Sequence, residues 1–239
     1  MTTTLAHSEI RTCSECSKPY QHDPCIINGT DMIAHFTQCD PCAASLHAAA
    51  ERKDRENNAR NRWESAIPQE YRKTRTDHPE YPQTLHKKAM TWLKSAHNEA
   101  RRPFLGLIGQ SGRGKSRVAS QVAKRLIWNG GHSQWCESFK FQWACQNQFN
   151  DTNGRDADAL IRQWRETANL IFDDIGSLKS TEVVCDTLYA LLEYRSSRSL
   201  PMIWTSNETP EEMLDKAHSE KSRARIISRL KGYSEIIEL

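Results

Sequence analysis

Residues 105–119, with the sequence LGLIGQSGRGKSRVA, combine glycines with a lysine and a hydroxyl residue at the spacing of a phosphate-binding loop. They fit the pattern G-x-x-x-x-G-K-[ST], in which backbone N–H groups turn toward phosphate oxygens and a helix N-terminus adds its dipole. Lys115 is expected to reach the β- and γ-phosphates of ATP, and Ser116 to hold Mg²⁺. The residues predicted to bind the nucleotide are Gly109, Gln110, Ser111, Gly112, Arg113, Gly114, Lys115, Ser116 and Arg117.

A second polar motif follows the apolar run of residues 169–172, which ends in Asp173 and Asp174. Asp173 is predicted to hold Mg²⁺ directly or through water. Asp174 is placed to orient and deprotonate an attacking water, a role usually filled by glutamate. The 58 positions from Lys115 to Asp173 leave room for an additional strand, which suits ATPases with an inserted strand better than small GTPases.

Three polar residues near the C-terminal end extend this chemistry. Asn207 follows a strand-like run at 201–206, where its side chain could contact the γ-phosphate or the attacking water. Arg225 and Arg229 lie one helical turn apart. Alone they indicate a basic amphipathic helix. Beside an ATPase, either arginine is a candidate finger that reaches a neighbouring subunit's nucleotide.

Five of the eight cysteines fall within the first 42 residues, and four of them form the pairs CSEC at 13–16 and CDPC at 39–42. Two such pairs complete a tetrahedral site, so the predicted Zn²⁺ ligands are Cys13, Cys16, Cys39 and Cys42. The 22 residues between the pairs slightly exceed the usual gap. Cys25, His22 or His35 could replace a ligand, and a reduced, reactive cysteine cluster is the alternative.

The composition bounds the class of protein. The mean hydropathy is −0.75, 26% of the residues are charged, and no apolar run approaches the length that a bilayer requires, so we expect no membrane partner. The N-terminus has no secretory pattern, and we expect a cytoplasmic protein. Residues 51–102 hold 13 basic and 8 acidic residues. This basic excess indicates either a nucleic-acid contact or a solvated charged helix.

Short apolar runs alternate with amphipathic stretches after Pro103, which predicts an α/β domain with a parallel sheet and helical crossovers. We expect strands near 104–108, 132–137, 169–173, 201–206 and 234–239. We expect helices near 43–66, 85–100, 115–128, 139–149, 180–197, 210–217 and 219–231. The predicted organisation is a zinc-binding module at 1–44, a helical basic linker at 45–66, and a P-loop ATPase domain at 67–239.

Four segments together resemble one family: GLIGQSGRGKSRVA, LIFDDIGS, MIWTSNET and RARIISRL. They are similar to the DnaC/IstB-type branch of AAA+ ATPases, which are helicase loaders and transposition helpers. The resemblance covers roughly residues 63–239. It assigns nucleotide and hydrolysis roles to Lys115, Ser116, Asp173, Asp174, Asn207 and Arg229, and a second basic position to Arg225. The segment IPQEYRKT at 67–74 is also family-like, which implies that Ile67, Pro68 and Tyr71 pack on adenine.

The resemblance implies an AAA+ core, ATP hydrolysis and a homo-oligomeric active form. Because the sequence ends at Leu239, we expect no C-terminal helical lid. The expected function is that of a replication ATPase that helps to load a ring helicase. Its expected partners are DNA, single-stranded by preference, and a replicative helicase or another DNA-bound protein.

Three alternatives remain open. An IstB-like transposition helper would share the same fold. A nucleotide-dependent binding switch would bind ATP with little turnover. A small-molecule P-loop kinase is disfavoured, because the cysteine pairs lie outside the core and Asp174 suits water activation.

Overall fold

The computed structural model describes residues 9–23, 25–27, 30–31, 33–34, 36–95, 102–150, 152–213 and 220–239. The chain divides into two compact units, Met1–Asn58 and Ala59–Leu239. Across these described ranges, no helix has both the length and the apolar character to cross a bilayer.

The first unit contains two small antiparallel hairpins and most of a long helix. Strands β1 (Glu9–Thr12) and β2 (Pro19–His22) form one hairpin, and β3 (Ile26–Ile27) and β4 (Thr30–Asp31) form the other. Helix α1 (Asp40–Ala66) is free of glycine, and its one proline, Pro41, stands in the first turn, where the missing N–H group costs no hydrogen bond. The predicted helix at 43–66 is therefore confirmed.

The second unit is built on a five-stranded parallel sheet with the order β6-β7-β8-β5-β9. Its strands are β5 (Phe104–Ile108), β6 (Ser133–Glu137), β7 (Asn169–Asp173), β8 (Met202–Ser206) and β9 (Ser234–Glu238). All five residues of each of the three central strands, β5, β7 and β8, are buried. Such unbroken apolar runs are typical of strands covered on both faces, and the predicted parallel α/β sheet is confirmed.

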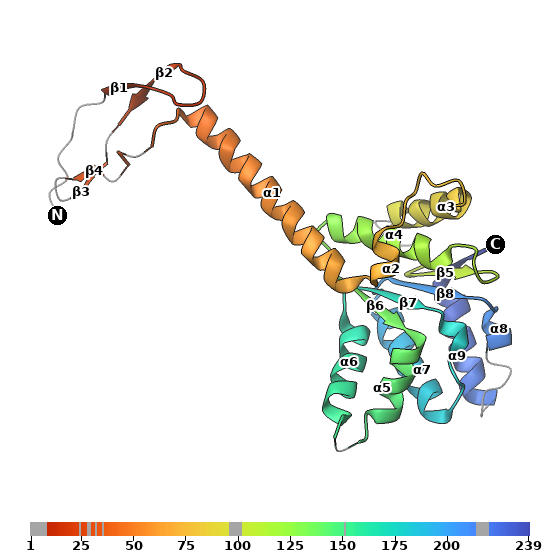
Figure 1. Ribbon diagram of the computed structural model, residues 1–239. Helices are drawn as coiled ribbons and strands as arrows, with labels where there is room; N and C mark the ends of the chain where they lie inside the picture. Colours follow the sequence, from red (N-terminus) through yellow and green to blue (C-terminus); the bar gives the residue numbers. More distant parts are fainter. Residues whose placement is uncertain are drawn as a thin grey trace. The chain divides into compact units, whose positions relative to one another are not determined.

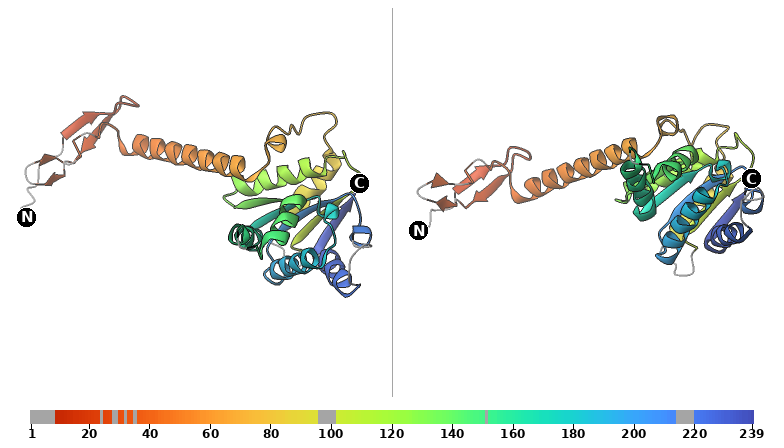
Figure 2. Two further views of the ribbon diagram at one scale, coloured as in Figure 1. Left: turned by 60° about the horizontal axis from the view of Figure 1, so that its bottom comes forward. Right: turned by 90° about the horizontal axis from the view of Figure 1, so that it is seen from below.

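Helices cover both faces of this sheet, as Figure 1 shows. The end of α1 with α3 (Gln83–Lys94) and α4 (Lys115–Trp128) packs on one face, around Leu105, Ile171 and Ile203. Helices α5 (Ser138–Asn147), α6 (Gly154–Glu166), α7 (Glu182–Ser197) and α9 (Glu220–Tyr233) pack on the other (Figure 2). The described part of this unit also contains three short helices: α2 (Gln69–Arg72), the 3-10 helix η2 (Ile175–Ser177) and α8 (Pro210–Met213).

Helices α5 and α6 differ from the predictions, and parts of three predicted helices lie outside the described residues. Helix α6 was not predicted, although Ala157, Ile161 and Trp164 bury one of its faces at helical spacing. Its glycine start and its many charges masked this signal. Helix α5 ends at Asn147, short of the predicted 149. Residues 96–100 of the predicted helix 85–100, 214–217 of the helix 210–217, and 219 of the helix 219–231 lie outside the described residues.

One buried arginine aligns the starts of two central strands. The Arg195 side chain is 0% exposed, and its Nη1 donates to the carbonyl oxygens of Trp164, Arg165 and Thr167 at 2.9–3.2 Å. Its Nη2 donates to the carbonyl oxygen of Pro201. Since Thr167 precedes β7 and Pro201 precedes β8, this fork ties α6 and the two strands to α7.

Candidate nucleotide site and metal centre

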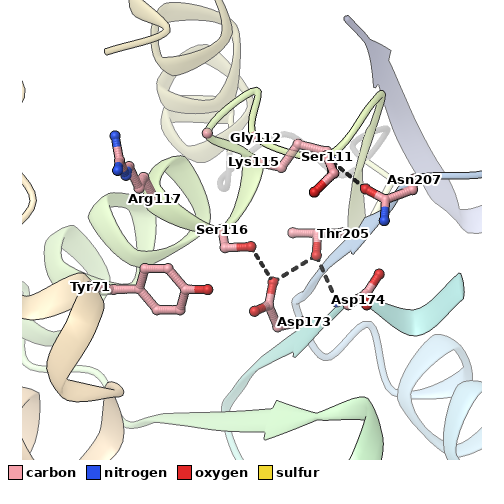
Figure 3. Close-up of a pocket in the computed structure, with 11 residues that line it drawn as sticks. Tyr71, Ser111, Gly112, Lys115, Ser116, Arg117, Asp173, Asp174, Thr205 and Asn207 are labelled. Carbon is pink, nitrogen blue, oxygen red and sulfur yellow. Dashed lines mark hydrogen bonds between the residues drawn. The ribbon is translucent and has the colours of Figure 1, made fainter. Parts of the chain in front are cut away.

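A pocket of about 340 Å³ opens where the carboxyl ends of β7 and β8 meet the glycine-rich loop after β5. Open parallel sheets bind ligands at this edge, because the loops there diverge from a rigid base. Most of the predicted site residues gather in it, from α2, the loop, α4, β7 and β8 (Figure 3). The lining residues are Tyr71, Ser111, Gly112, Gly114, Lys115, Ser116, Arg117, Asp173, Asp174, Thr205 and Asn207.

Two glycines give the loop its shape. Gly112 and Gly114 have φ angles of 79° and 80°, in the left-handed region that residues with a Cβ rarely adopt. A Cβ on Gly114 would also lie 2.9 Å from Cδ of Pro82, whereas one on Gly112 would meet nothing within 4 Å. Gly114 therefore both turns the chain into α4 and lets the segment before α3 approach. Gly112 leaves open space beside the pocket.

Lys115 extends back over the loop. Its Nζ donates to the carbonyl oxygens of Gly109 at 2.6 Å and Gln110 at 2.9 Å, and to Oδ1 of Asn207 at 2.8 Å. Burial lowers the pKa of the ammonium group, and the charges of Asp174 and Asp173 oppose that shift. The lysine thus links the loop to the end of β8 and points a cation at the pocket.

Ser116, Asp173 and Thr205 form a hydrogen-bonded group of oxygen atoms (Figure 3). The Ser116 hydroxyl donates to Oδ1 of Asp173 at 2.6 Å, and the Thr205 hydroxyl donates to the same atom at 2.7 Å. Burial raises the pKa of Asp173, and the two hydroxyl bonds oppose the rise. Mg²⁺ prefers such oxygen ligands, so Ser116 and Asp173 fit a magnesium site.

Thr205 was not predicted as a site residue. It lies one residue beyond the Phe172–Trp204 pair of β7 and β8, which sets it beside Asp173. The available signal was a hydroxyl residue at the end of a buried strand, a weak one until the strand order is known. Its Oγ1 also accepts the backbone N–H of Asp174 at 2.8 Å.

Asp174 adopts a left-handed conformation, with φ 56° and ψ 47°. This is uncommon outside glycine, and aspartate tolerates it better than most residues. Its carbonyl oxygen accepts bonds from the backbone N–H and the hydroxyl of Ser177, both at 3.0 Å. These contacts fix the turn after β7, so the second carboxylate also lines the pocket.

The other predicted nucleotide contacts are placed differently. Tyr71 lines the pocket, whereas Ile67 is 1% exposed in the core beneath α4 and, like Pro68, is not among the lining residues. Gln110 contributes its carbonyl oxygen to Lys115, and the side chain of Arg113 is exposed.

The two helical arginines lie on α9, away from the pocket lining. Arg229 pairs with Glu193 of α7, and its guanidinium carbon stands 5.9 Å from the ring centre of Tyr189 and 5.7 Å from that of Tyr233. Arg225 lies over Tyr189 at 5.4 Å. Within one chain, the structure therefore does not bring either arginine to the nucleotide pocket.

In the first unit, the ligand atoms of the four predicted cysteines lie within 4.8 Å of one another. The sulfurs of Cys16 and Cys39 are 3.8 Å apart. A tetrahedral zinc with bonds of about 2.3 Å spaces its sulfurs by about 3.8 Å, whereas a disulfide requires about 2 Å. The four sulfurs thus fit a metal site.

Backbone hydrogen bonds assemble this cluster. Ser14 N donates to the carbonyl oxygen of Thr37 at 2.9 Å, which holds the two cysteine turns together. Backbone N–H groups of Cys16 and Cys39 lower the pKa of Cys13 to about 6. The neighbouring sulfurs raise the pKa of Cys42. One sulfur is thereby prepared to act as a thiolate, the form that binds metal.

The spare candidate ligands do not join the cluster among the described residues. Nε2 of His22 lies 2.9 Å from Oδ2 of Asp31, and this histidine is buried. Asp31 also accepts the backbone N–H of Cys25, whose side chain is exposed. His35 lies outside the described residues.

We compared the chain with known proteins. A search against protein-family models returned no match. The chain is 27% identical over 126 residues to a Mycobacterium tuberculosis protein that is named as an ATP-binding protein in an insertion sequence. That match covers 51% of this chain and 45% of the relative.

Solved structures share more of the chain. The DnaI structure matches with a TM-score of 0.59 and 19% identity, over 72% of this chain and 94% of DnaI. The DnaC helicase loader matches with a TM-score of 0.52 and 14% identity, over 72% of this chain and 99% of DnaC. The second unit has the AAA+ P-loop fold.

The replication initiator DnaA shares this fold over a smaller part of its own length. DnaA bound to AMPPCP and single-stranded DNA matches with a TM-score of 0.53 and 14% identity, over 68% of this chain. This chain spans 50% of that DnaA chain and 46% of the Aquifex aeolicus DnaA. At these identities the likeness to the AAA+ proteins concerns the fold.

Proposed function

We propose that this chain is an ATP-binding and ATP-hydrolysing accessory protein of DNA replication that helps to load a ring helicase. One arrangement supports the proposal: Lys115, Ser116, Asp173, Asp174 and Asn207 surround a single pocket in an AAA+ unit. The overlap with nearly the whole of the DnaI and DnaC chains favours the loader over other AAA+ classes.

In this proposal the glycine-rich loop and Lys115 hold the phosphates of ATP, and Ser116 and Asp173 hold Mg²⁺, which supplies charge neutralisation. Asp174 takes a proton from the attacking water while the water oxygen bonds to the γ-phosphorus. The bond from phosphorus to the β–γ bridging oxygen then breaks. Asn207, already hydrogen-bonded to Lys115, orients the water or the γ-phosphate.

The active form in this proposal is a homo-oligomer, with Arg229 of one subunit acting on the nucleotide of the next. Arg229 is partly exposed on α9, so its ion pair with Glu193 can be exchanged for a neighbour's phosphate. Arginine fingers accelerate related phosphoryl transfers by about 10³-fold or more. Mixing Asp174→Asn with Arg229→Ala subunits should restore activity at interfaces that pair the two intact residues. Co-assembly without restored activity would refute the role of Arg229 in trans.

DNA, with single strands preferred, and a DNA-bound protein complete the proposed partners. A second candidate, an IstB-like transposition helper, is favoured by the similarity to the insertion-sequence protein.

Zn²⁺ at the four cysteines completes the proposed cofactors. The proposed organisation is a zinc module at 1–44, a helical basic linker at 45–66 and the AAA+ domain at 67–239.

The deciding experiment measures ATP turnover with and without single-stranded DNA, and capture of a purified replicative helicase with ATP or ADP. A loader should show turnover stimulated by single-stranded DNA and capture that depends on the nucleotide. Lys115→Ala, which removes the cation that meets the phosphates, should lose ATP binding and both effects. ATP-dependent DNA coating without helicase capture would favour the transposition helper, and tight ATP binding without turnover would favour the switch.

A further inference from the structure

Tyr71 enters the pocket from a part of the chain that belongs to neither the glycine-rich loop nor the sheet. It lies on the short helix α2, between α1 and α3. Figure 3 shows its phenol pointing toward Ser116 and Asp173, the two residues whose oxygens fit Mg²⁺. Packing on adenine would use the face of the tyrosine ring and would not require the hydroxyl to point toward Ser116 and Asp173.

Ring packing and two backbone contacts hold Tyr71 in place. The Tyr71 ring lies against the Trp135 ring, with centroids 5.2 Å apart and planes inclined by 32°. Nε of Arg72 donates to the carbonyl oxygen of Ile67 at 2.7 Å, and Ile67 is anchored in the core. The backbone N–H of Tyr71 donates to the carbonyl oxygen of Pro68 at 3.0 Å. The phenol is therefore held in place before any ligand arrives.

The Tyr71 hydroxyl can both donate and accept a hydrogen bond, because a phenol carries one proton and oxygen lone pairs. Asp173 Oδ1 already accepts from Ser116 and Thr205. Once the serine hydroxyl turns to a cation, the Tyr71 hydroxyl is placed to accept a hydrogen bond from a cation-bound water, because the oxygen of such a water faces the ion and its hydrogens point away.

We infer that the Tyr71 hydroxyl is a positioning group for the hydrated divalent cation that accompanies the nucleotide. Magnesium keeps several of its waters when it binds through one or two protein oxygens, so groups around it act on those waters. Tyr71 acts in this way, through a cation-bound water. The inference rests on the proposed function, since it requires that Ser116 and Asp173 hold a cation with the nucleotide.

The test separates the hydroxyl from the ring. Tyr71→Phe keeps the ring on Trp135 and removes the hydroxyl, whereas Tyr71→Leu removes both. Tyr81→Phe is the matched control, because the Tyr81 hydroxyl pairs with Nδ1 of His86 at 2.5 Å and Tyr81 does not line the pocket. Binding of a fluorescent, non-hydrolysable ATP analogue is measured over a series of Mg²⁺ concentrations and in excess EDTA. Paramagnetic resonance measures the concentration of free Mn²⁺, and the decrease of this signal on binding gives the affinity for the cation directly.

Tyr71→Phe should raise the half-saturating Mg²⁺ and Mn²⁺ concentrations by about 5- to 10-fold, the effect of one lost hydrogen bond. Analogue binding in EDTA should stay within about twofold of wild type, and Tyr81→Phe should match wild type throughout. Unchanged cation dependence in Tyr71→Phe overturns the inference. Equal weakening with and without the cation also overturns it, because the hydroxyl would then contact the nucleotide itself.

Two further outcomes would contradict the inference in different ways. If Tyr71→Leu weakens binding equally in both conditions while Tyr71→Phe is normal, the ring packs on adenine and the hydroxyl has no role, which overturns the inference. If the wild-type chain binds no nucleotide, the proposed function fails and the inference falls with it. That failure is visible in the wild type, so it cannot be confused with a failure of Tyr71 alone.

Discussion

Among the described residues of the first unit, the buried ones are Cys13 and His22, whereas the sheet of the second unit is covered by apolar side chains on both faces. Both units nevertheless gather polar groups into a small volume. In the second unit, the fold does this without a ligand, because buried strands set Asp173 beside Thr205 and Ser116. The described residues of the first unit form no comparable core that could hold the four sulfurs together.

The difference indicates two sources of order. A unit this small, with so little buried apolar surface, requires a metal or another cross-link to fold. The side chains of the nucleotide site are instead brought together by the core of the second unit, without a ligand. Perturbing the metal should therefore affect folding, and perturbing the pocket should affect binding and chemistry. The predictions below test this contrast, from the largest expected effect to the smallest.

Removing zinc should unfold the first unit and spare the second. Structural zinc contributes about 10–16 kcal/mol of binding free energy in small zinc-binding peptides, far more than this unit's core can supply. Metal analysis should find one zinc per chain, lost in Cys39→Ser, and proteolysis should then cleave the segment around residues 9–42. Nucleotide affinity should be unchanged.

Cys25→Ser is the matched control, because this exposed cysteine lies outside the cluster. It should keep the zinc and the resistance to proteolysis. Loss of nucleotide binding in Cys39→Ser, measured with Mg²⁺ present, would break the contrast, because it would show that the second unit depends on the first.

Asp174→Asn should keep ATP binding and lose hydrolysis. The substitution preserves the shape of the side chain and removes the proton acceptor, and general-base catalysis contributes about 10²- to 10⁴-fold. Single-turnover hydrolysis measures the loss, and a nucleotide titration measures the binding. The thermal midpoint should match wild type, since asparagine also tolerates the left-handed backbone. Normal turnover would mean that another residue activates the water.

Arg195→Met should destabilise the second unit without changing the first. The substitution retains bulk but removes the hydrogen bonds to four carbonyl oxygens, two at the end of α6 and two just before β7 and β8. The Pro201 oxygen keeps the backbone N–H of Leu170 at 3.1 Å. We expect the loss of these buried hydrogen bonds to lower the free energy of unfolding by about 3–5 kcal/mol. Urea unfolding measures the loss, and zinc content should stay the same.

Arg198→Ala is the control for this experiment, because Arg198 is exposed and stacks on Tyr194. It should cost less than about 0.5 kcal/mol. If the two variants are equally stable, the fork of Arg195 does not hold the strand starts together.

Thr205→Val should have the smallest effect of the series. The substitution removes a buried hydroxyl that bonds both Asp173 and Asp174, so we expect a loss of about 1–2 kcal/mol in stability. Turnover should fall less than about 10-fold if Thr205 only orients the two carboxylates. Thr205→Ser keeps the hydroxyl and should retain most of the activity. A Thr205→Val variant as inactive as Asp174→Asn would show that Thr205 acts in the chemistry itself.

The sequence predicted the features that depend on residues close together in the chain. Buried strands are continuous apolar runs, so β5 and β7 were placed at their observed bounds. The spacing of the cysteine pairs named the four sulfurs that the structure brings together. Helix α6 was missed because its apolar positions are diluted by charge, and only its packing against α5 and α7 reveals the buried face.

The orientation of Tyr71 could not be predicted from the neighbouring sequence. The segment at 67–74 indicated a contact with the nucleotide, and Tyr71 does line the pocket. The direction of its hydroxyl depends on Trp135, more than 60 positions away, and on the anchoring of Ile67 beneath α4. No short-range pattern contains this information.

What the sequence determined by itself is the chemistry that is available: a phosphate-binding loop, two adjacent carboxylates, an amide at a strand end and four thiols in two turns. These depend on residue types at fixed, short spacings, which the backbone converts directly into local geometry. Tertiary structure alone decided which groups meet. The parallel order β7-β8-β5 sets Thr205 on Asp173 and Asn207 on Lys115, and the fold keeps Arg229 on α9 with Glu193. Such contacts depend on packing between segments distant in the chain, and that packing is set by the burial of whole faces.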